Sequence, residues 1–437
     1  MLWRSVSRIA AHHVASPRVA AAAFAAAASY SMCATPPASA DALGGPRSAG
    51  EAARDQLLRI PATDTGLRLV TYNVLSSHLC EPTYYVHSPP EDLKPETRLE
   101  RVKTLLQDEI SRGSVVCLQE VSTTWSGELT PFFEANGYTF VTGLYGNRFN
   151  GYMGVALAWP TYRFQSEAVD ITRASDTKAW PKPPPSSKTG IGAWWGKTTS
   201  YTSKVWRGVK EAVRFGPPPK PPIEPWAESA RRQNVLVSAR LRDRATGRTF
   251  CVSTYHMPCL FGSDPKNQVM VIHSALVAQR AAAFADGLPF VLAGDFNIQP
   301  DSSPYEFLTS GALPADHPHR PPPRSYDAWT PDLAAPLQSA YVLSSYEKEP
   351  DFTNFARTKG QAEPFVGTLD YIFLGNGAAA PGAPGGWGVT QVKPLDDRKH
   401  VTVKSYPCAE EPSDHVLVWA ELELPAARAT DTVTESA

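Results

Sequence analysis

The sequence of 437 residues has no long hydrophobic run, no paired cysteines and almost no net charge. Its longest apolar stretch, Val19 to Ala28, covers ten residues, whereas a membrane-spanning helix needs about 20. The six cysteines include no CxxC pair, which argues against a zinc ribbon or a disulfide scaffold. The 42 lysines and arginines nearly balance the 43 acids, so no global field attracts nucleic acid or lipid. An integral membrane protein is therefore excluded.

Several short catalytic motifs are also absent. The chain has no GxxxxGK phosphate-binding loop, no HExxH helix, and no local signature of a Ser–His–Asp or Cys–His nucleophile. It shows no internal repeat and no leucine-rich array. Neither a covalent catalytic route nor a leucine-rich-repeat partner interface is therefore expected.

The first 40 residues contain three arginines, Arg4, Arg8 and Arg18, and no acid. Trp3 would share one helical face with Val6 and Ile9. An arginine-rich, acid-free, amphipathic start is typical of an organellar transit peptide, so we expect residues 1–40 to be a leader. A mitochondrial destination is favoured, and a plastid or another organelle is the alternative. The segment could also be a low-complexity N-terminus without a targeting function. Residues 41–65 and 427–437 are expected to be a disordered linker and tail.

Residues 66–426 are predicted to form one folded domain. Apolar segments of strand length are numerous there, whereas two stretches, from Pro95 and from Gln268 to Ala285, have helical periodicity. Many strands and few helices indicate an α/β fold in which sheet packs on sheet with helices outside. The expected strands cover 67–75, 115–118, 138–141, 153–159, 234–241, 249–255, 290–293, 369–374 and 415–424.

A proline-rich insertion at residues 175–228 interrupts this pattern. Between residues 176 and 226 it carries nine lysines and arginines, three acids and five tryptophans. Cations that neutralise phosphates and aromatic rings that stack on bases would suit a surface arm for RNA. The alternative is a solvated loop whose tryptophans pack locally.

Polar residues that suit phosphate chemistry lie where apolar segments begin or end. Glu120 and Asp295 end two such segments, Asp370 lies near the start of a third, and Asp414 and His415 open another. An unpaired carboxylate inside an apolar strand is expensive, and a bound hard cation would remove that cost. Mg²⁺ prefers carboxylates together with water and phosphate.

Further polar residues accompany these acids. Asn297 follows Asp295 by two positions, which in extended chain would point both side chains the same way. His256 and Asn73 end two other expected strands. A metal that polarises a phosphoryl oxygen, a base that deprotonates water, and Asn and His donors would together cleave a phosphate ester.

The motifs around these residues occur in the order found in the endonuclease/exonuclease/phosphatase superfamily, which the chain resembles over about residues 66–426. The matching segments are Tyr-Asn73-Val-Leu, Cys-Leu-Gln-Glu120-Val, Tyr-His256, Gly-Asp295-Phe-Asn297, Leu-Asp370-Tyr-Ile-Phe and Pro-Ser-Asp414-His415. The resemblance implies a four-layer α/β/β/α sandwich like that of deoxyribonuclease I, with a Mg²⁺ site that Mn²⁺ could also fill.

The same resemblance implies a role for each residue. Glu120 would hold the metal with help from Asn73 and Asp414. Asp295 would activate water, and Asn297 would stabilise the transition state. The implied phosphate contacts are His256 and His415, with Asp370 orienting His415.

A narrower resemblance is to the deadenylase branch, to which nocturnin, the Angel proteins and the mitochondrial 2′,5′-phosphodiesterase belong. It is carried by residues 295–308 and by Phe-Thr-Asn354-Phe, followed by Phe365-Val-Gly-Thr-Leu-Asp. In that branch an aromatic residue at the place of Phe365 stacks on adenine, and the alternative for Phe365 is a partly buried loop aromatic. Asn297 or Asn354 is the candidate for hydrogen-bonding the base. The sequence departs from the branch in the loop after His256 and in the basic insertion.

The resulting expectation is a Mg²⁺-dependent phosphodiesterase, a 3′-to-5′ exoribonuclease of deadenylase type that acts on adenylate-rich RNA ends. A phosphodiesterase or phosphatase for a small adenine nucleotide, such as 2′,5′-oligoadenylate or NADP(H), remains an alternative. A DNA-repair endonuclease and a catalytically inactive RNA-binding protein are further alternatives.

Overall fold

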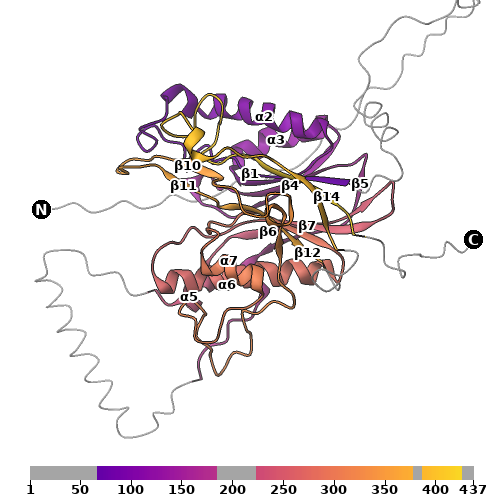
Figure 1. Cartoon of the computed structure of the whole chain (residues 1–437), viewed down its shortest axis with the longest axis vertical. Coiled ribbons are helices and arrows are strands. Elements are labelled where there is room, and N and C mark those ends of the chain that lie inside the picture. The colour runs from indigo at the N-terminus through magenta and orange to yellow at the C-terminus, as the bar shows by residue number, and fades with distance from the viewer. Residues whose placement is uncertain (1–65, 185–222, 377–385, 426–437) are drawn as a thin grey trace, which may run out of the picture. The chain divides into compact units, whose positions relative to one another are not determined.

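A computed structural model describes residues 66–184, 223–376 and 386–425 (Figure 1). The expected leader 1–40, linker 41–65 and tail 427–437 lie outside the described residues, as do residues 185–222 of the insertion. In the part of the chain that is described, no helix has the length and apolar character needed to cross a bilayer.

Two six-stranded mixed sheets form the centre of the domain. In each sheet one pair of neighbouring strands is parallel, β1 with β2 and β7 with β8, and the other pairs are antiparallel. The first sheet contains, in spatial order, β13 (Gly388–Val392), β14 (Val418–Glu423), β1 (Gly66–Asn73), β2 (Val115–Val121), β4 (Gly154–Pro160) and β3 (Tyr138–Leu144). The second contains β5 (Phe164–Arg173), β6 (Val235–Asp243), β7 (Thr249–His256), β8 (Phe290–Asp295), β12 (Asp370–Gly375) and β9 (Gln338–Ser339).

The main core lies between the two sheets. Because strand side chains alternate between faces, Leu67 and Leu69 of β1 point into this core, whereas Val70 and Tyr72 point to the opposite face. There they pack with apolar residues of α2 (Pro95–Ser111) and α3 (Thr123–Ala135). On the second sheet, α6 (Asp264–Ala285) and α7 (Ser303–Ser310) cover the outer face in the same way (Figure 1). The predicted four-layer sandwich is confirmed.

The smaller elements complete the loops at the ends of the strands. Hairpin β10 (Asn354–Ala356) and β11 (Phe365–Gly367) forms a separate two-stranded sheet. The remaining helical turns are η1 (Pro90–Leu93), η2 (Arg148–Asn150), η3 (Ala174–Thr177), α5 (Pro225–Arg231), α8 (Ala340–Leu343) and η4 (Arg398–His400).

Both parallel strand pairs end at the same end of the sandwich. Helix α2 connects β1 to β2, and α6 connects β7 to β8, so each pair is a strand–helix–strand unit. Asn73 ends β1 and His256 ends β7, and the latter residue is in register with Asp295 of β8. A hydrogen bond of 2.9 Å from Asn73 Nδ2 to Asp295 Oδ2 joins the ends of the two sheets.

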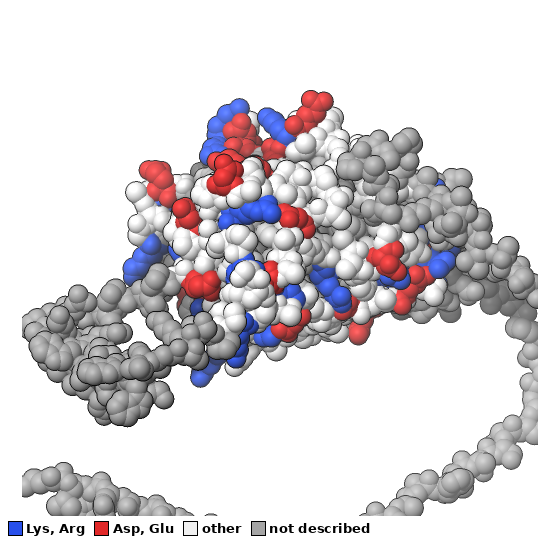
Figure 2. Space-filling view, turned by 90° about the horizontal axis from the view of Figure 1, so that it is seen from below, with Lys and Arg blue, Asp and Glu red and all other residues white. Residues whose placement is uncertain are grey.

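The described stems of the insertion are packed against the domain. Lys178 lies over the rings of Trp180, Trp226 and Trp329, and its Nζ is 2.8 Å from an Asp327 carboxylate oxygen. At these positions the tryptophans pack locally, as the loop interpretation predicts. Figure 2 views the molecule from the side of α5, α6 and α7 and shows acidic and basic side chains intermixed there.

Candidate active site

Asp295 is the centre of a polar cluster at the ends of β7, β8 and β12. Its backbone is in register with His256 on one side and with Asp370 on the other. Gly294 precedes it with a φ of +151°, and an added Cβ would lie 1.9 Å from the carbonyl oxygen of Tyr255. Only glycine allows the strands to approach so closely at this point.

His415 connects the two carboxylates of this cluster. Its Nδ1 is 2.7 Å from Asp370 Oδ2, and its Nε2 is 3.7 Å from Asp295 Oδ2. Burial alone would lower the pKa of His415, but the negative charges of Asp370 and Asp295 outweigh burial and raise it well above its ordinary value. Thr353 Oγ1 donates to Asp370 Oδ2 at 2.6 Å and so helps to fix the acceptor of the imidazole.

The carboxylate of Asp295 is almost completely buried, at 1% exposure of the residue. Burial raises its pKa, and the neighbouring His415 and His256 oppose that rise. Its oxygens accept hydrogen bonds from Asn73 Nδ2 and from the backbone N–H of Asn297, both at 2.9 Å. Hydrogen bonds therefore fix the position of the Asp295 carboxylate, and its affinity for a proton exceeds that of an exposed carboxylate.

Asn297 does not follow the extended chain that the sequence analysis assumed. Its φ is +49°, in the left-handed region, and its side-chain Nδ2 donates to the carbonyl oxygen of Met257 at 3.1 Å. The argument that Asp295 and Asn297 point the same way because they alternate in a strand is therefore wrong. What brings the two residues together is the turn in which the Asn297 N–H caps the Asp295 carboxylate.

Glu120 reaches the cluster from a β-bulge in β2. The register with β4 shifts between Gln119 and Val121, and Glu120 itself has a φ of +60°. Its Oε2 accepts the backbone N–H of Ser76 at 3.0 Å, and its Oε1 accepts Asn73 Nδ2 at 3.3 Å. His256 Nε2 lies 4.0 Å from the same Oε1 and 3.5 Å from Asp295 Oδ2, which places it between two carboxylates.

Tyr85 holds Asp414 and also feels the charge of Glu120. The Tyr85 hydroxyl donates to Asp414 Oδ2 at 2.8 Å. Burial, and then the charges of Asp414 and Glu120, raise the pKa of Tyr85 well above its ordinary value. The tyrosine therefore remains a neutral donor at physiological pH.

Three polar residues of the cluster were not found from the sequence. Tyr85 donates to Asp414, and Thr353 donates to Asp370. The Tyr145 hydroxyl lies 3.0 Å from His256 Nδ1. Thr353 stands directly before Asn354 in a motif that the sequence analysis quoted, so it was within reach. Tyr85 and Tyr145 lie in loops, and no local pattern distinguishes them from other surface aromatics.

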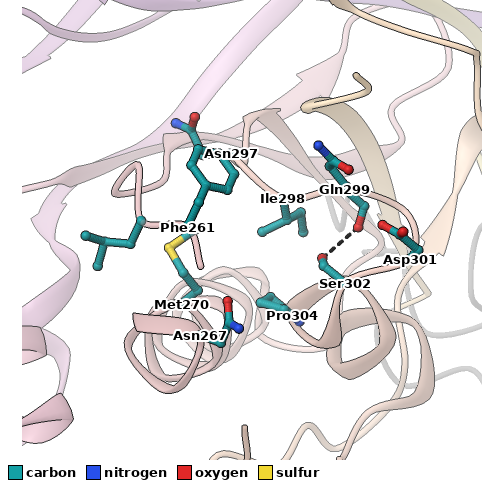
Figure 3. A pocket seen from close by; sticks show the side chains of 10 residues that line it. Phe261, Asn267, Met270, Asn297, Ile298, Gln299, Asp301, Ser302 and Pro304 are labelled. Carbon is teal, nitrogen blue, oxygen red and sulfur yellow. Dashed lines mark hydrogen bonds between the residues drawn. The ribbon is translucent and has the colours of Figure 1, made fainter. Parts of the chain in front are cut away.

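A cavity of about 210 Å³ opens beside Asn297 (Figure 3). Phe261, Met270 and Ile298 provide apolar lining, and polar groups are contributed from the loop after β8 and the start of α6. The residues that line the cavity are Leu260, Phe261, Asn267, Met270, Asn297, Ile298, Gln299, Asp301, Ser302 and Pro304.

Neither Phe365 nor Asn354 lines this cavity, but Phe365 stands beside the lining residue Phe261. The centroids of the Phe365 and Phe261 rings are 6.5 Å apart, at 45° to each other. Phe365 is half-buried on β11 and packs over Gly367. Asn354 is 5% exposed on β10, bridges to His415 through the backbone, and is not among the cavity-lining residues.

Two groups of side chains could hold a metal ion. The ligand atoms of Asp295, Asp370 and His415 lie within 4.8 Å of one another, and Asp370 Oδ1 is buried without a hydrogen-bond partner in the described structure. His415 and Asp370 already bind each other, however. Glu120 and Asp414 offer carboxylate oxygens, which a hard cation prefers. The amide oxygen of Asn73 accepts a hydrogen bond from the N–H of Leu75, so its Nδ2 faces the carboxylates of Glu120 and Asp295.

Comparisons with known proteins agree on the family of the chain. A sequence model of the Endonuclease/Exonuclease/phosphatase family matches residues 70–415. The chain is similar to 2′,5′-phosphodiesterase 12 of Mus musculus, with 24% identity over 381 residues that cover 82% of this chain and 52% of the relative. It is also similar to the CCR4-Not complex 3′-5′-exoribonuclease subunit Ccr4 of Phaeosphaeria nodorum, with 24% identity over 423 residues, 84% of this chain and 62% of the relative.

A similar fold is found in the crystal structure of ANGEL2, described as a 2′,3′-cyclic phosphatase in complex with adenosine-2′,3′-vanadate. The TM-score is 0.58 at 18% identity, over 82% of this chain and 96% of that one. This likeness concerns the arrangement of the layers. The chain spans about half the length of the 2′,5′-phosphodiesterase 12 relative.

Proposed function

Because the chain belongs to the endonuclease/exonuclease/phosphatase family, we propose that it is a divalent-cation-dependent phosphodiesterase, and specifically a 3′-to-5′ exoribonuclease that shortens adenylate-rich RNA ends. One observation carries the proposal. Asp295 is a buried carboxylate with a raised pKa, it lies between His256 and His415, and Asn73 Nδ2 donates both to it and to Glu120. This arrangement supports a role for Asp295 in activating water, for the two imidazoles in binding phosphate and for Glu120 in binding a cation.

The donor set fits a hard divalent cation. Glu120 and Asp414 would hold Mg²⁺, or Mn²⁺ in its place, and the ion when bound would neutralise charge on the phosphoryl oxygens. Asp370 Oδ1 is a buried carboxylate oxygen that has no partner among the described residues, so it could supply a further ligand.

Asp295 is the residue that would accept a proton from the attacking water. A general base works best when its pKa lies near the working pH, and burial moves the pKa of Asp295 upward. Asn73 and the Asn297 N–H keep its oxygens in place without removing their capacity to accept. No nucleophilic serine or cysteine is needed for this step.

The two histidines would bind the phosphate. The raised pKa of His415 keeps its imidazole protonated, with Nδ1 held by Asp370 and Nε2 directed towards Asp295. The neutral Tyr145 hydroxyl can donate to His256 Nδ1, which places the ring proton on Nε2. Both Nε2 atoms would then donate to charge that develops on the phosphoryl group.

The cavity next to Asn297 would take the terminal base. Phe261 lines it and Phe365 stands beside Phe261, with the two ring centroids 6.5 Å apart, and stacking on such rings tolerates any base. The acidic side chain of Asp301 and the amides of Asn267 and Gln299 line the same cavity, and they can accept from an exocyclic amino group. An adenine at the end of the chain fits this lining.

A small adenine nucleotide is the second candidate substrate. The cavity of about 210 Å³ is suited to one base, so the described site alone does not require a polymer. A curated relative is named a 2′,5′-phosphodiesterase, which adds 2′,5′-oligoadenylate to the substrates worth testing.

A substrate panel tests the proposal. Purified protein with Mg²⁺ would be incubated with oligo(A), oligo(U), 2′,5′-oligoadenylate, duplex DNA and NADP(H), and the products separated. We expect stepwise release of 5′-AMP from the 3′ end of oligo(A). Preferred hydrolysis of NADP(H) or of 2′,5′ linkages would favour the small-nucleotide candidate, and duplex nicking would favour a DNA-repair endonuclease.

Glu120→Gln is the matched control for this panel. It keeps the shape of the side chain and removes the charge that a cation needs, so activity should fall by about 10²-fold or more. Circular dichroism should show an unchanged fold, because glutamine keeps an oxygen that can still accept the backbone N–H of Ser76. Near-normal Mg²⁺-dependent turnover in this variant would contradict the assignment of Glu120 as a metal ligand.

We further propose that the protein acts in mitochondria. The support is the acid-free, arginine-containing segment 1–40. A fusion of residues 1–50 to a fluorescent protein should co-localise with a mitochondrial dye, and diffuse fluorescence would count against it.

A further inference from the structure

The loop between β3 and β4 presents aromatic rings to solvent. Phe149 is 80% exposed and Tyr152 is 53% exposed, on the segment that contains η2. Arg148, which directly precedes Phe149 in the sequence, is also exposed, and its side chain has no hydrogen-bond or ion-pair partner within the described residues. Such exposure of a large apolar ring is unfavourable unless something covers it.

This loop is rigidly held. Asn147 Oδ1 accepts the N–H of Phe149 at 2.9 Å, and Asn150 Oδ1 accepts the N–H of Asn147 at 2.7 Å, so the two side chains form a capping box. Tyr152 has a φ of +53°, which is a strained conformation for a bulky residue. A backbone that is fixed and strained in this way presents its rings in one direction.

The loop is attached to the catalytic residues at both ends. Tyr145, at its start, contacts His256 Nδ1 at 3.0 Å. The carbonyl oxygen of Asn150 accepts Ser76 Oγ at 2.9 Å, and the N–H of Ser76 donates to Glu120. The loop therefore stands beside the same carboxylates that the proposed function uses.

The base cavity lies on the other sheet. It follows β8 and adjoins α6, whereas the loop joins β3 to β4 of the first sheet. A substrate with its terminal base against Phe261 and its phosphate at Asp295 can continue past Asn73 and Glu120 towards the first sheet. The next nucleotide would then meet the exposed rings.

We propose that Phe149 and Tyr152, with Arg148, form a stacking platform for the nucleotide on the far side of the scissile phosphate, and that its occupant is a single-stranded polynucleotide. Stacked bases cover aromatic faces, and the free guanidinium suits a backbone phosphate. The inference rests on the proposed function, because it places the cleaved phosphate at Asp295. It adds a site that a mononucleotide substrate would leave unused.

Steady-state kinetics of Phe149→Ala in the full-length protein test this platform. With an oligo(A) of about 12 nucleotides, the KM should rise about tenfold and kcat should change little, since the loss of one stacked base weakens binding. The inhibition constant of 5′-AMP, which needs only the base cavity, should stay within about twofold. Phe149→Tyr should restore the KM, because it restores the ring.

Tyr346→Ala is the matched control, since Tyr346 is 46% exposed and lies outside the β3–β4 loop and the segments that line the base cavity. Its KM for oligo(A) should equal that of the wild type. An unchanged KM in a folded Phe149→Ala protein that cleaves oligo(A) would overturn the platform and leave the proposed function standing. A wild-type protein that neither cleaves nor binds oligo(A) would overturn both.

Discussion

Two of the proposed catalytic side chains project from backbone in the left-handed region. Glu120 has a φ of +60° and Asn297 a φ of +49°, and neither is glycine. Such conformations cost about 1–3 kcal/mol each and persist where the surroundings determine them. At Glu120 the bulge turns the carboxylate out of the strand ladder, and at Asn297 the turn brings a backbone N–H onto Asp295. Both conformations therefore place hydrogen-bonding groups at one point.

Phe365 permits a direct test of base stacking. Phe365→Ala would remove the aromatic ring beside Phe261 and should cost about 1–3 kcal/mol in binding, with little dependence on salt. The loss should appear mainly in KM, because the ring holds ground state and transition state alike. Wild type and variant would be compared on A-rich and U-rich oligonucleotides of equal length. A folded variant that loses nothing on either RNA would refute the stacking role.

His273 gives a prediction about pH and stability. It is buried in α6, its Nδ1 is 3.1 Å from the Tyr255 hydroxyl, and burial lowers its pKa to about 4. Below pH 6.5 the unfolded chain binds a proton that the folded chain refuses, so the free energy of unfolding falls as pH falls towards 4. Between pH 7 and 5 this residue should account for a loss of about 2 kcal/mol.

Urea denaturation of the wild type and of His273→Gln at the two pH values measures that contribution. The variant should be less stable at pH 7, and its loss on going to pH 5 should be smaller by about 2 kcal/mol. Equal pH dependence of the two proteins would show that His273 is not held neutral.

At the scale of elements, helix α2 connects the active-site loops to each other. Arg98 on this helix is completely buried, and it donates to the carbonyl oxygens of Val74, Leu75 and Pro412. These carbonyls belong to the loop after β1 and to the loop that leads into Asp414. One guanidinium therefore fixes the relative positions of segments more than 300 residues apart in sequence.

Arg98→Lys should disrupt this arrangement while keeping the charge. A lysine cannot reach three carbonyls at once, and the lost charged hydrogen bonds should lower the free energy of unfolding by about 3 kcal/mol. Activity should fall too, since the loop before Asp414 loses its support. Arg101→Lys on the same helix is the control, because the Arg101 side chain is 31% exposed and should cost less than about 1 kcal/mol.

The sequence predicted elements and site residues where a local pattern marks them. Asp295, His256 and Asn73 each end a buried apolar strand, and such a boundary is visible in the sequence alone. Strand β5 was not predicted, because most of its residues are exposed or half-buried and apolar and polar residues do not alternate cleanly. Helix α3 was not predicted either, since Pro131 lies inside it. Tyr85 contacts Asp414 from 329 residues away, which no local pattern encodes.

At the scale of the whole molecule, the insertion can be tested by deletion. Residues 185–222 would be replaced by about ten Gly and Ser residues, which leaves Lys178 and Trp226 in place. Dinucleotide turnover should stay the same, because the active-site residues lie outside this segment. A salt titration of binding to a long RNA then decides its role: an arm for RNA predicts a flatter slope, by about 0.7 for each lost phosphate contact, and a tolerated loop predicts no change.

The position of the insertion in the chain has a further consequence. The segment before it supplies β5 to the second sheet, and the segment after it supplies β13 and β14 to the first. The two halves thus exchange strands at one side of each sheet, and the active site takes Asn73 and Glu120 from one half and Asp295 from the other. A protease cut between residues 185 and 222 should leave one particle that still turns over substrate. Either fragment alone would have unpaired strand edges and half an active site, so the halves are natural candidates for fragment complementation.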